Sequence, residues 1–247
     1  MPTPTIRFLE ARFDLPLRHE QVPQWRGAFA EWVGEVENSD LFHNHANGAA
    51  EEYHHRYPQV QYRSVRGKAT LIAMNDGIEA VAGLFQRPGD WSIRWEGIPQ
   101  PLRLEQMHFD TCELGLLPNG LREYRLLRWL ALNEDNYHIW KQLGTFRERV
   151  ELLDRTLAAN LLSLCSGLNW KIPRRFEAHL TLVERIGSAQ VHGVEVMTFD
   201  CRFATDLVLP VGLGMGKSSS LGFGVLLPVR SKNSTTSLHP HRHELTG

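Results

Sequence analysis

Two histidines separated by one residue, His43 and His45, stand in the polar segment LFHNHANG at residues 41–48. An imidazole takes up and releases a proton near neutral pH, because its unperturbed pKa is about 6.5. The pair could therefore provide a general base and a general acid for one reaction. Spacing alone leaves two alternatives open, a shared metal ion or an exposed pair in a polar loop. We find no nearby DxD motif that would complete a metal-ligand set.

A second candidate is the glycine- and serine-rich run GLGMGKSSSLGFG at Gly212–Gly224. A phosphate-binding P-loop needs four residues between its first glycine and the Gly-Lys-Ser, followed by a long helix. Here only three residues separate Gly212 from Gly216, and the residues after Ser220 are typical of a strand. A dinucleotide fingerprint also lacks its third glycine. We expect a flexible loop of exposed amides, hydroxyls and Lys217 that could hold a phosphate backbone, with a plain tight connection as the alternative.

The elements that position these residues form a first unit with the order strand, helix, strand, strand, helix, strand. Apolar residues alternate in the strands and recur at helical spacing in the helices, and Arg66-Gly67 is typical of a β-hairpin turn. We expect the first five elements at Ile6–Phe13, Val22–Val36, Val60–Val65, Ala69–Met74 and Gly77–Phe85, with strands resuming at Trp91–Trp95 and Leu104–Leu114.

A second unit begins near Arg122–Leu132 and contains a helix at Glu148–Leu168, with Gly167 as the expected stop. Strands follow at Phe176–Glu184 and Val194–Phe203, separated by Gly187 and Gly193, and Val225–Leu227 closes the order. The sequence thus predicts an α+β protein with domains at residues 1–115 and 116–228. The polar end, residues 229–247, is expected to be a disordered tail rather than a metal site.

Charge and cysteine content set further limits. The net charge is −1 and the pI is about 6.9, so the charge of the whole chain neither favours nor excludes nucleic acid. Basic residues gather in the middle of the chain, however, which allows a local RNA-binding surface. Three widely spaced cysteines without a CxxC pair argue against a disulfide framework or a zinc ribbon. Without a signal pattern or an apolar run of ~20 residues, we expect a cytoplasmic protein without membrane contact.

The chain resembles the CRISPR-associated Cas six endoribonucleases, in the branch with paired histidines after the first helix. The resemblance covers roughly residues 5 to 228. It rests on the order and spacing of FHNH, RYPQVQYRSVRGKATLIAMNDG, LRWLALNEDNY, LLDRTLAANLLSLCSGLNW and GLGMGKSSSLGFGVL.

That resemblance implies two tandem ferredoxin-like (βαββαβ, RRM-like) domains that bind the repeat of a precursor CRISPR RNA and cut once per repeat. The reaction it implies needs no metal or other cofactor. The 2′-hydroxyl before the cut attacks the adjacent phosphate and leaves a 2′,3′-cyclic phosphate, or its opened form, and a 5′-hydroxyl. Because the substrate carries the nucleophile, the protein needs only proton transfer and charge stabilisation.

The resemblance also assigns roles to residues. His43 and His45 match the paired histidines and are the expected base and acid, in either order, with Tyr53 and His55 as secondary candidates that orient the phosphate. The expected RNA-binding residues are Arg56, Lys68, Arg174, Arg175, Gly212, Gly214, Gly216, Lys217, Ser218, Ser219, Ser220 and Gly222. For Arg174 and Arg175 a solvated basic turn is the alternative.

The expected partner is CRISPR repeat RNA, with effector-complex proteins and a second copy of the chain as further partners left open. Two other functions also stay open. The chain could hold processed RNA without cutting it, or it could be a metal-dependent nuclease that uses the HxH pair.

Overall fold

The N-terminal domain is built on a four-stranded antiparallel sheet with the order β2-β3-β1-β6. A computed structural model describes residues 4–34, 40–43, 57–86 and 91–229 of the chain. The sheet strands are β1 Thr5–Pro16, β2 Val60–Val65, β3 Lys68–Met74 and β6 Leu104–Glu113. The hairpin between β2 and β3 turns at Arg66-Gly67, where both residues have positive φ (53° and 74°), as a two-residue turn requires.

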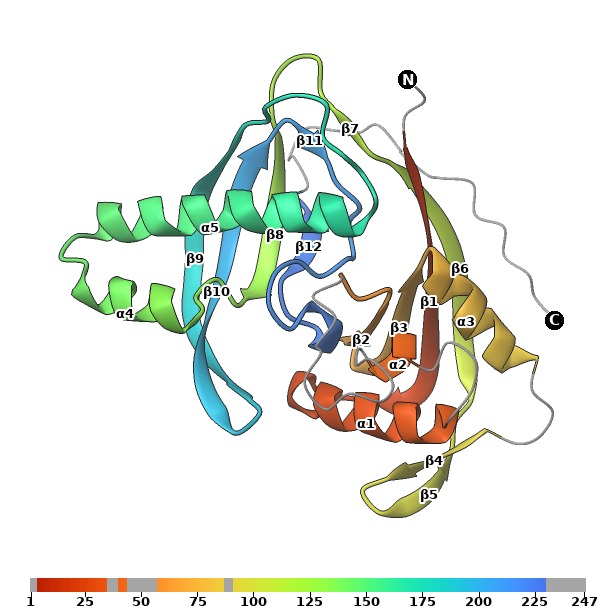
Figure 1. Ribbon diagram of the computed structural model, residues 1–247. Coiled ribbons are helices and arrows are strands. Elements are labelled where there is room, and N and C mark those ends of the chain that lie inside the picture. The colour runs from red at the N-terminus through yellow and green to blue at the C-terminus, as the bar shows by residue number, and fades with distance from the viewer. Residues whose placement is uncertain (1–3, 35–39, 44–56, 87–90, 230–247) are drawn as a thin grey trace.

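Two helices, α1 (Val22–Val33) and α3 (Asp76–Phe85), cover one face of this sheet (Figure 1). Their aromatic and aliphatic side chains pack on the alternate residues of β1 that point to the same face, such as Leu9 and Phe13. Three small elements complete the domain: the 3-10 turn η1 (His19–Gln21), the short helix α2 (Asp40–His43) and the two-stranded sheet of β4 (Ser92–Trp95) and β5 (Ile98–Pro101).

The C-terminal domain repeats the strand order, as β12-β8-β10-β9. Its strands are β8 Arg122–Trp129, β9 Ala178–Val191, β10 Val194–Thr205 and β12 Val225–Pro228. The long helix α5 (Phe146–Gly167) crosses this sheet and buries a row of leucines against it (Figure 1). It begins where it does because Thr145 and Glu148 cap its first turn reciprocally. Helix α4 (Glu134–Gln142) precedes it.

The two strand orders confirm the predicted fold, an α+β protein of two tandem ferredoxin-like domains. In the second unit, however, the connection between β10 and β12 is not a full helix. It consists of the short strand β11 (Leu207–Val208), the glycine-rich loop and the 3-10 turn η2 (Ser219–Leu221). The expected boundary at residue 115 remains a proposal, since strand β7 (Gly115–Leu116) spans it and pairs with β11.

Some expected boundaries are wrong. Helix α1 ends at Val33 rather than residue 36, because Gly34 adopts a positive φ of 65° that ends the helix. Gly187 does not break the strand at Phe176–Glu184: it pairs with Thr198 inside the β9–β10 hairpin, whose turn lies at His192-Gly193. Helix α4 is an addition to the expected order. The tail beyond Val229 lies outside the described residues.

The domains share their hydrophobic cores. Ile72 and Met74, on the face of the first sheet opposite its helices, pack with residues of the second domain such as Trp129. Conversely, Leu221 and Phe223 of the glycine-rich loop pack in the core of the first domain. The glycine-rich loop is therefore held between the two domains rather than projecting from one of them.

Candidate nucleic-acid interface

The glycine-rich loop has a defined backbone path. Its first arm pairs with β12, through hydrogen bonds from the Gly212 N–H to the Leu226 carbonyl (2.7 Å) and from the Met215 N–H to the Gly224 carbonyl (2.7 Å). A β-carbon on Gly224 would stand 1.9 Å from the Met215 carbonyl oxygen, so this position excludes every larger residue. Gly216 and Gly222 have φ of +83° and +79°.

Much of this loop is buried. Ser219 and Ser220 are only 4% and 7% exposed, and Gly214 and Gly222 are buried as well. The expectation of a flexible loop with exposed hydroxyls and amides is therefore wrong for these four residues. The reason is that the loop fills the junction between the domains. Its solvent-accessible parts are Gly212, which is half-buried, and the stretch 216–218, where Lys217 is exposed and Gly216 and Ser218 are half-buried.

Side chains of the first domain bind the loop backbone directly. The Tyr57 hydroxyl donates to the Gly214 carbonyl oxygen (2.6 Å), and the Gly214 N–H donates to Gln61 Oε1 (2.9 Å). Gln61 Nε2 in turn donates to the Tyr57 hydroxyl oxygen (2.9 Å). These three bonds close a ring that engages both polar groups of one loop peptide residue.

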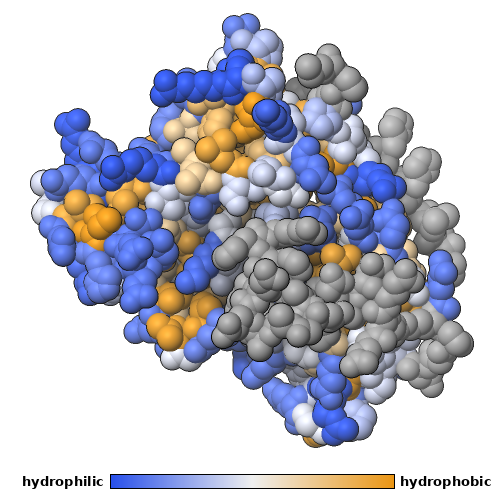
Figure 2. All heavy atoms as spheres, in the orientation of Figure 1, coloured by the Kyte–Doolittle hydropathy of each residue, from blue (hydrophilic) through white to orange (hydrophobic). Residues whose placement is uncertain are grey.

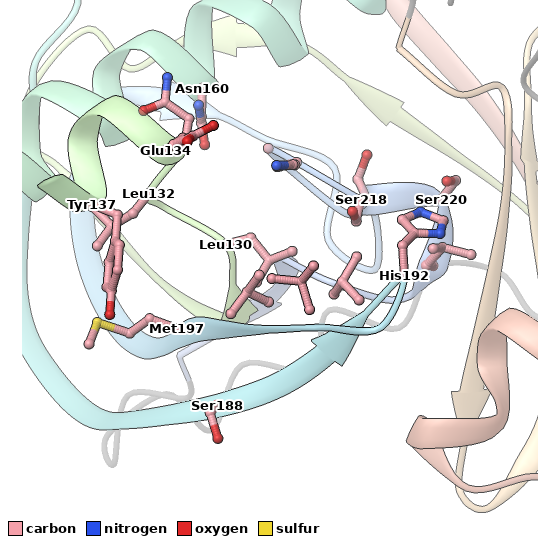
Figure 3. A pocket seen from close by; sticks show the side chains of 18 of the residues that line it. Leu130, Leu132, Glu134, Tyr137, Asn160, Ser188, His192, Met197, Ser218 and Ser220 are labelled. Atoms are coloured by element: carbon pink, nitrogen blue, oxygen red, sulfur yellow. The ribbon is translucent and has the colours of Figure 1, made fainter.

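A cleft of about 1330 Å³ opens beside the loop, between the two domains. Its walls come from α1, α4, α5, the β9–β10 hairpin and loop residues 216–221. In the view of Figure 3, Tyr137 and Met197 lie at one end of the cleft and His192, Ser218 and Ser220 at the other. Figure 2 shows apolar side chains gathered over the β9–β10 hairpin, which is one of the parts of the second domain that line the cleft.

Lys217 is an exposed cation on the rim of this cleft. It also lines an adjoining hollow of about 520 Å³ between α4 and α5, together with Arg155, Asn136 and Asn160. Asn160 is held in place because its Oδ1 accepts from the Trp129 indole N–H (2.8 Å). The combination of apolar walls, one exposed aromatic ring at Tyr137, amides and a cation is suited to bases and phosphates of an unpaired strand.

The histidine-bearing segment starts close to this loop. His43 is the last residue of α2, and the preceding Phe42 is buried. The Tyr62 hydroxyl donates to the Phe42 carbonyl oxygen (3.2 Å), while the Tyr62 carbonyl oxygen lies 3.4 Å from where a β-carbon on Gly222 would stand. One residue of β2 thus touches both the end of α2 and the loop. His45, Tyr53, His55 and Arg56 lie outside the described residues.

The structure does not bring Lys68 to the cleft. Its ammonium group binds Glu105 Oε1 (2.8 Å) and the Asp14 carbonyl oxygen (3.1 Å) on the sheet of the first domain. This ammonium group holds the pKa of the Glu105 carboxyl below its usual value. Phosphate binding by Lys68 would have to compete with that ion pair.

Arg174 and Arg175 also lie away from the cleft. Arg174 pairs with Asp206 (2.8 Å) and donates to the Leu117 carbonyl oxygen (3.2 Å), which ties together the connections around β7 and β11. Arg175 is exposed next to it. The guanidinium of Arg174 is therefore engaged in contacts within the protein.

The basic middle of the chain is partly neutralised. Arg125 and Arg202 both bind the Glu184 carboxylate (2.6 and 2.7 Å), which lowers the pKa of that carboxyl. Arg128 lies over the Phe223 ring, 4.6 Å from its centroid, and burial lowers the pKa of its guanidinium. The pKa of nearby His19 is lowered by burial and by the positive charge of Arg128.

Sequence reasoning missed several residues of this surface, namely Tyr57, Gln61, Tyr137, Asn160 and His192. Tyr57 and Gln61 stand in the motif RYPQVQY, yet nothing in their spacing shows that they bind a loop more than 150 residues away. In the described part of the chain, no group of three or more His, Cys, Asp or Glu could hold a metal ion. That part does not include the HxH pair, so the metal alternative is not tested by it.

Fold and cleft define a protein of tandem ferredoxin-like domains with a glycine-rich loop held between them. Comparison with known proteins then gives the family: residues 4–113 match the Cas6b N-terminal domain and residues 117–229 match the Cas6b C-terminal domain. The chain belongs to the Cas6b family.

Solved structures share the fold over nearly the whole chain. One described as "Crystal structure of Cas6b" has a TM-score of 0.78 at 21% identity, covering 92% of this chain and 100% of that one. A second, "Crystal structure of CRISPR RNA processing endoribonuclease Cas6b", has a TM-score of 0.68 at 20% identity with the same coverage. Among curated proteins, "Uncharacterized protein MJ0978" of Methanocaldococcus jannaschii is 30% identical over 117 residues, which are 47% of this chain and 78% of that protein. None of the helices in the described residues is long and apolar enough to cross a membrane.

Proposed function

We propose that this chain is an endoribonuclease that binds CRISPR repeat RNA and cuts precursor crRNA within each repeat. The observation that carries the proposal is the match of both domains to the two halves of the Cas6b family. A solved structure that shares the fold is described as a CRISPR RNA processing endoribonuclease. Membership in this family favours cleavage over RNA binding alone.

The proposed chemistry starts from the substrate. The 2′-hydroxyl of the nucleotide before the cut attacks the neighbouring phosphorus, and the bond from phosphorus to the 5′-oxygen breaks. The products carry a 2′,3′-cyclic phosphate, or its opened form, and a 5′-hydroxyl. The reaction needs a base for the 2′-hydroxyl proton and an acid for the leaving oxygen, and no metal ion takes part.

His43 and His45 are the proposed base and acid, with Tyr53 and His55 as secondary candidates. The backbone at the end of α2 supports this choice, because Tyr62 contacts both Phe42 and the glycine-rich loop. The end of α2 and the loop at Gly222 are therefore both in contact with the same residue of β2.

We place the RNA along the cleft, with Lys217 and the backbone at 216–218 against its phosphates. Tyr137 offers a ring for stacking of an unpaired base, and the amides of Asn133 and Asn160 offer hydrogen bonds. We assign Lys68 and Arg174 no direct contact in this arrangement, since both are engaged in ion pairs elsewhere.

The test is a cleavage assay on repeat RNA with the wild-type chain and the variants His43→Ala and His45→Ala, each with and without EDTA. Each variant should slow single-turnover cleavage by roughly 10²–10⁴-fold, the range for loss of a general acid or base, with little change in RNA affinity. EDTA should change little. Cleavage that disappears in EDTA and returns only with Zn²⁺ or Mn²⁺ would move the histidines to metal ligation, and a wild-type chain that binds but never cuts would leave the RNA-binding alternative.

A further inference from the structure

The ring of hydrogen bonds around Gly214 joins the parts of the proposed site that come from different domains. Tyr57 and Gln61 belong to the first domain, and Gly214 belongs to the glycine-rich loop of the second. Each bond in the ring is 2.6–2.9 Å long, and each group in it both gives and receives a hydrogen bond. Because the ring is closed, loss of one donor leaves a buried acceptor unpaired and loosens the remaining two bonds.

Gly214 itself is fixed by its surroundings. A β-carbon on this residue would stand 2.9 Å from the carbonyl oxygens of both Phe223 and Ser219. The loop therefore has no room to move at this point without disturbing the turn that carries Lys217 and the serines. A hydrogen bond to the Gly214 peptide therefore restrains the whole loop.

Tyr57 is equally constrained. A β-carbon on Gly167, the last residue of α5, would stand only 2.0 Å from the Tyr57 β-carbon, so the tyrosine packs directly against the helix backbone. Burial raises the pKa of the Tyr57 hydroxyl, which keeps it protonated and able to donate to Gly214 at any working pH. Tyr57 also lines the cleft.

A buried positive charge lies next to the ring and binds it at Gln61. Arg63 is 3% exposed and donates through its guanidinium to Gln61 Oε1, the same atom that accepts from Gly214. Among the described residues, its Nε has no hydrogen-bond partner and no carboxylate lies within 4.0 Å of the guanidinium. This charge holds the Gln61 amide with its oxygen toward Gly214 and its NH2 toward Tyr57.

Tyr57 directly follows the stretch of the chain that holds the candidate catalytic residues. The stretch from His43 to Arg56, which holds all four candidate catalytic side chains, is bounded by Phe42 and Tyr57. Phe42 is bound by Tyr62 of β2, and Tyr57 is bound by Gln61 of the same strand. Both ends of the stretch are therefore hydrogen-bonded to β2, and the ring binds the glycine-rich loop to the same strand.

We propose that Tyr57 and Gln61 are positioning residues for the cut, which hold the phosphate-binding loop of the second domain against β2 of the first, the strand that also binds Phe42 at the end of α2. The inference rests on the proposed function. Tyr57 is not assigned a contact with the reacting atoms. The role of Tyr57 is to fix the position of the loop relative to β2, and a misplacement of about 1 Å in a catalytic site can cost roughly 10²-fold in rate.

The test compares Tyr57→Phe with Tyr124→Phe. Tyr124 is a matched control, because its hydroxyl likewise both donates and accepts: it donates to the Leu207 carbonyl oxygen of β11 (3.3 Å) and accepts from the Leu209 N–H (2.9 Å). Two kinds of measurement are needed. The first is the rate of single-turnover cleavage at saturating protein, together with the Kd for repeat RNA. The second is the rate of hydrogen exchange of the Gly214 amide, which needs no RNA.

Tyr57→Phe should slow single-turnover cleavage by about 10- to 100-fold while the Kd changes less than about 3-fold, since phosphate contacts dominate affinity. Exchange of the Gly214 amide should become at least about 10-fold faster. Tyr124→Phe should leave cleavage and Gly214 exchange within about 3-fold of wild type. An equal loss of cleavage in Tyr124→Phe would mean general destabilisation and would overturn the positioning role, as would unchanged exchange in Tyr57→Phe.

Gln61→Glu is the second variant, chosen because it should fold even if Tyr57→Phe does not. The carboxylate has the shape of the amide and gains Arg63 as a charged partner. It draws the Tyr57 hydroxyl away from Gly214, since hydrogen bonds to a charged acceptor are stronger. We expect an unfolding temperature at or above that of wild type together with slower cleavage. Wild-type cleavage by both variants would overturn the positioning role alone, whereas no cleavage by the wild-type chain would overturn the proposed function and the positioning role with it.

Discussion

Replacement of Gly216 by alanine should destabilise the fold because of two separate strains. The first is conformational: Gly216 has a φ of +83°, and an L-residue in that region costs about 1–2 kcal/mol. The second is steric: the new β-carbon would stand 2.5 Å from Asn160 Oδ1 and 3.1 Å from Trp129 Nε1, the two atoms of a hydrogen bond at 2.8 Å. Displacing Asn160 leaves the buried indole N–H unpaired, which costs about 1–3 kcal/mol more.

Gly212→Ala separates the two strains. Gly212 lies in the same loop with a similar φ of +88°, but no atom of the described residues stands within 4 Å of the position of a β-carbon there. Urea unfolding should therefore show a loss of about 1–2 kcal/mol for Gly212→Ala and about 2–5 kcal/mol for Gly216→Ala. The larger loss is a sizeable part of the 5–15 kcal/mol that holds a typical domain together.

A double-mutant cycle identifies the source of the difference. In an Asn160→Ala background the Asn160 side chain no longer blocks the new β-carbon, so the cost of Gly216→Ala should fall by about 0.5–3 kcal/mol, the range for coupled neighbours. Equal losses for the two glycine variants, or a cost of Gly216→Ala that is the same in both backgrounds, would refute the packing described for this loop.

Two further predictions concern charge. Lys217→Ala should weaken repeat-RNA binding and lower the slope of log K against log salt by about 1, with no change in unfolding, while Lys68→Ala should leave that slope unchanged; equal slopes for the two variants would contradict the assignment of the phosphate contact to Lys217. The pKa of Glu184 is lowered in the folded state by Arg202 and Arg125, so its contribution to stability is complete above the unfolded pKa of about 4.3 and is lost as pH falls through the lower, folded pKa. Glu184→Gln should therefore unfold more easily than wild type at pH 7 in urea melts, and the gap should narrow as the pH falls below about 4.3; a gap that stays constant as the pH falls would contradict the ion pairs.

The local elements could be predicted from the sequence because their signals are local. Alternating apolar residues marked β1, and the Arg66-Gly67 turn marked the β2–β3 hairpin. The leucines of α5 recur at helical spacing and gave its length to within a few residues. Their order predicted a βαββαβ unit for the first domain, whereas the ferredoxin-like fold of both domains was implied by the resemblance to the Cas six endoribonucleases.

The surroundings of the glycine-rich loop could not be predicted in this way. Glycine and serine are typical of exposed loops, but here the loop is buried because residues 153 and 157 positions away bind both polar groups of Gly214. Such contacts depend on how the two sheets pack, which no local pattern encodes. Lys68 and Arg174 were expected at the RNA, but their partners Glu105 and Asp206 are likewise distant in sequence and could not be foreseen.

The most direct test of the proposed chemistry is cleavage of a repeat RNA that carries a single 2′-deoxy nucleotide immediately before the cut. The missing hydroxyl should change the Kd little, because phosphates dominate affinity. If the 2′-hydroxyl is the nucleophile, the deoxy RNA must resist cleavage in a single-turnover assay in which the intact RNA is cut at one position per repeat. Cleavage of the deoxy RNA at the rate of the intact RNA would contradict the transesterification mechanism.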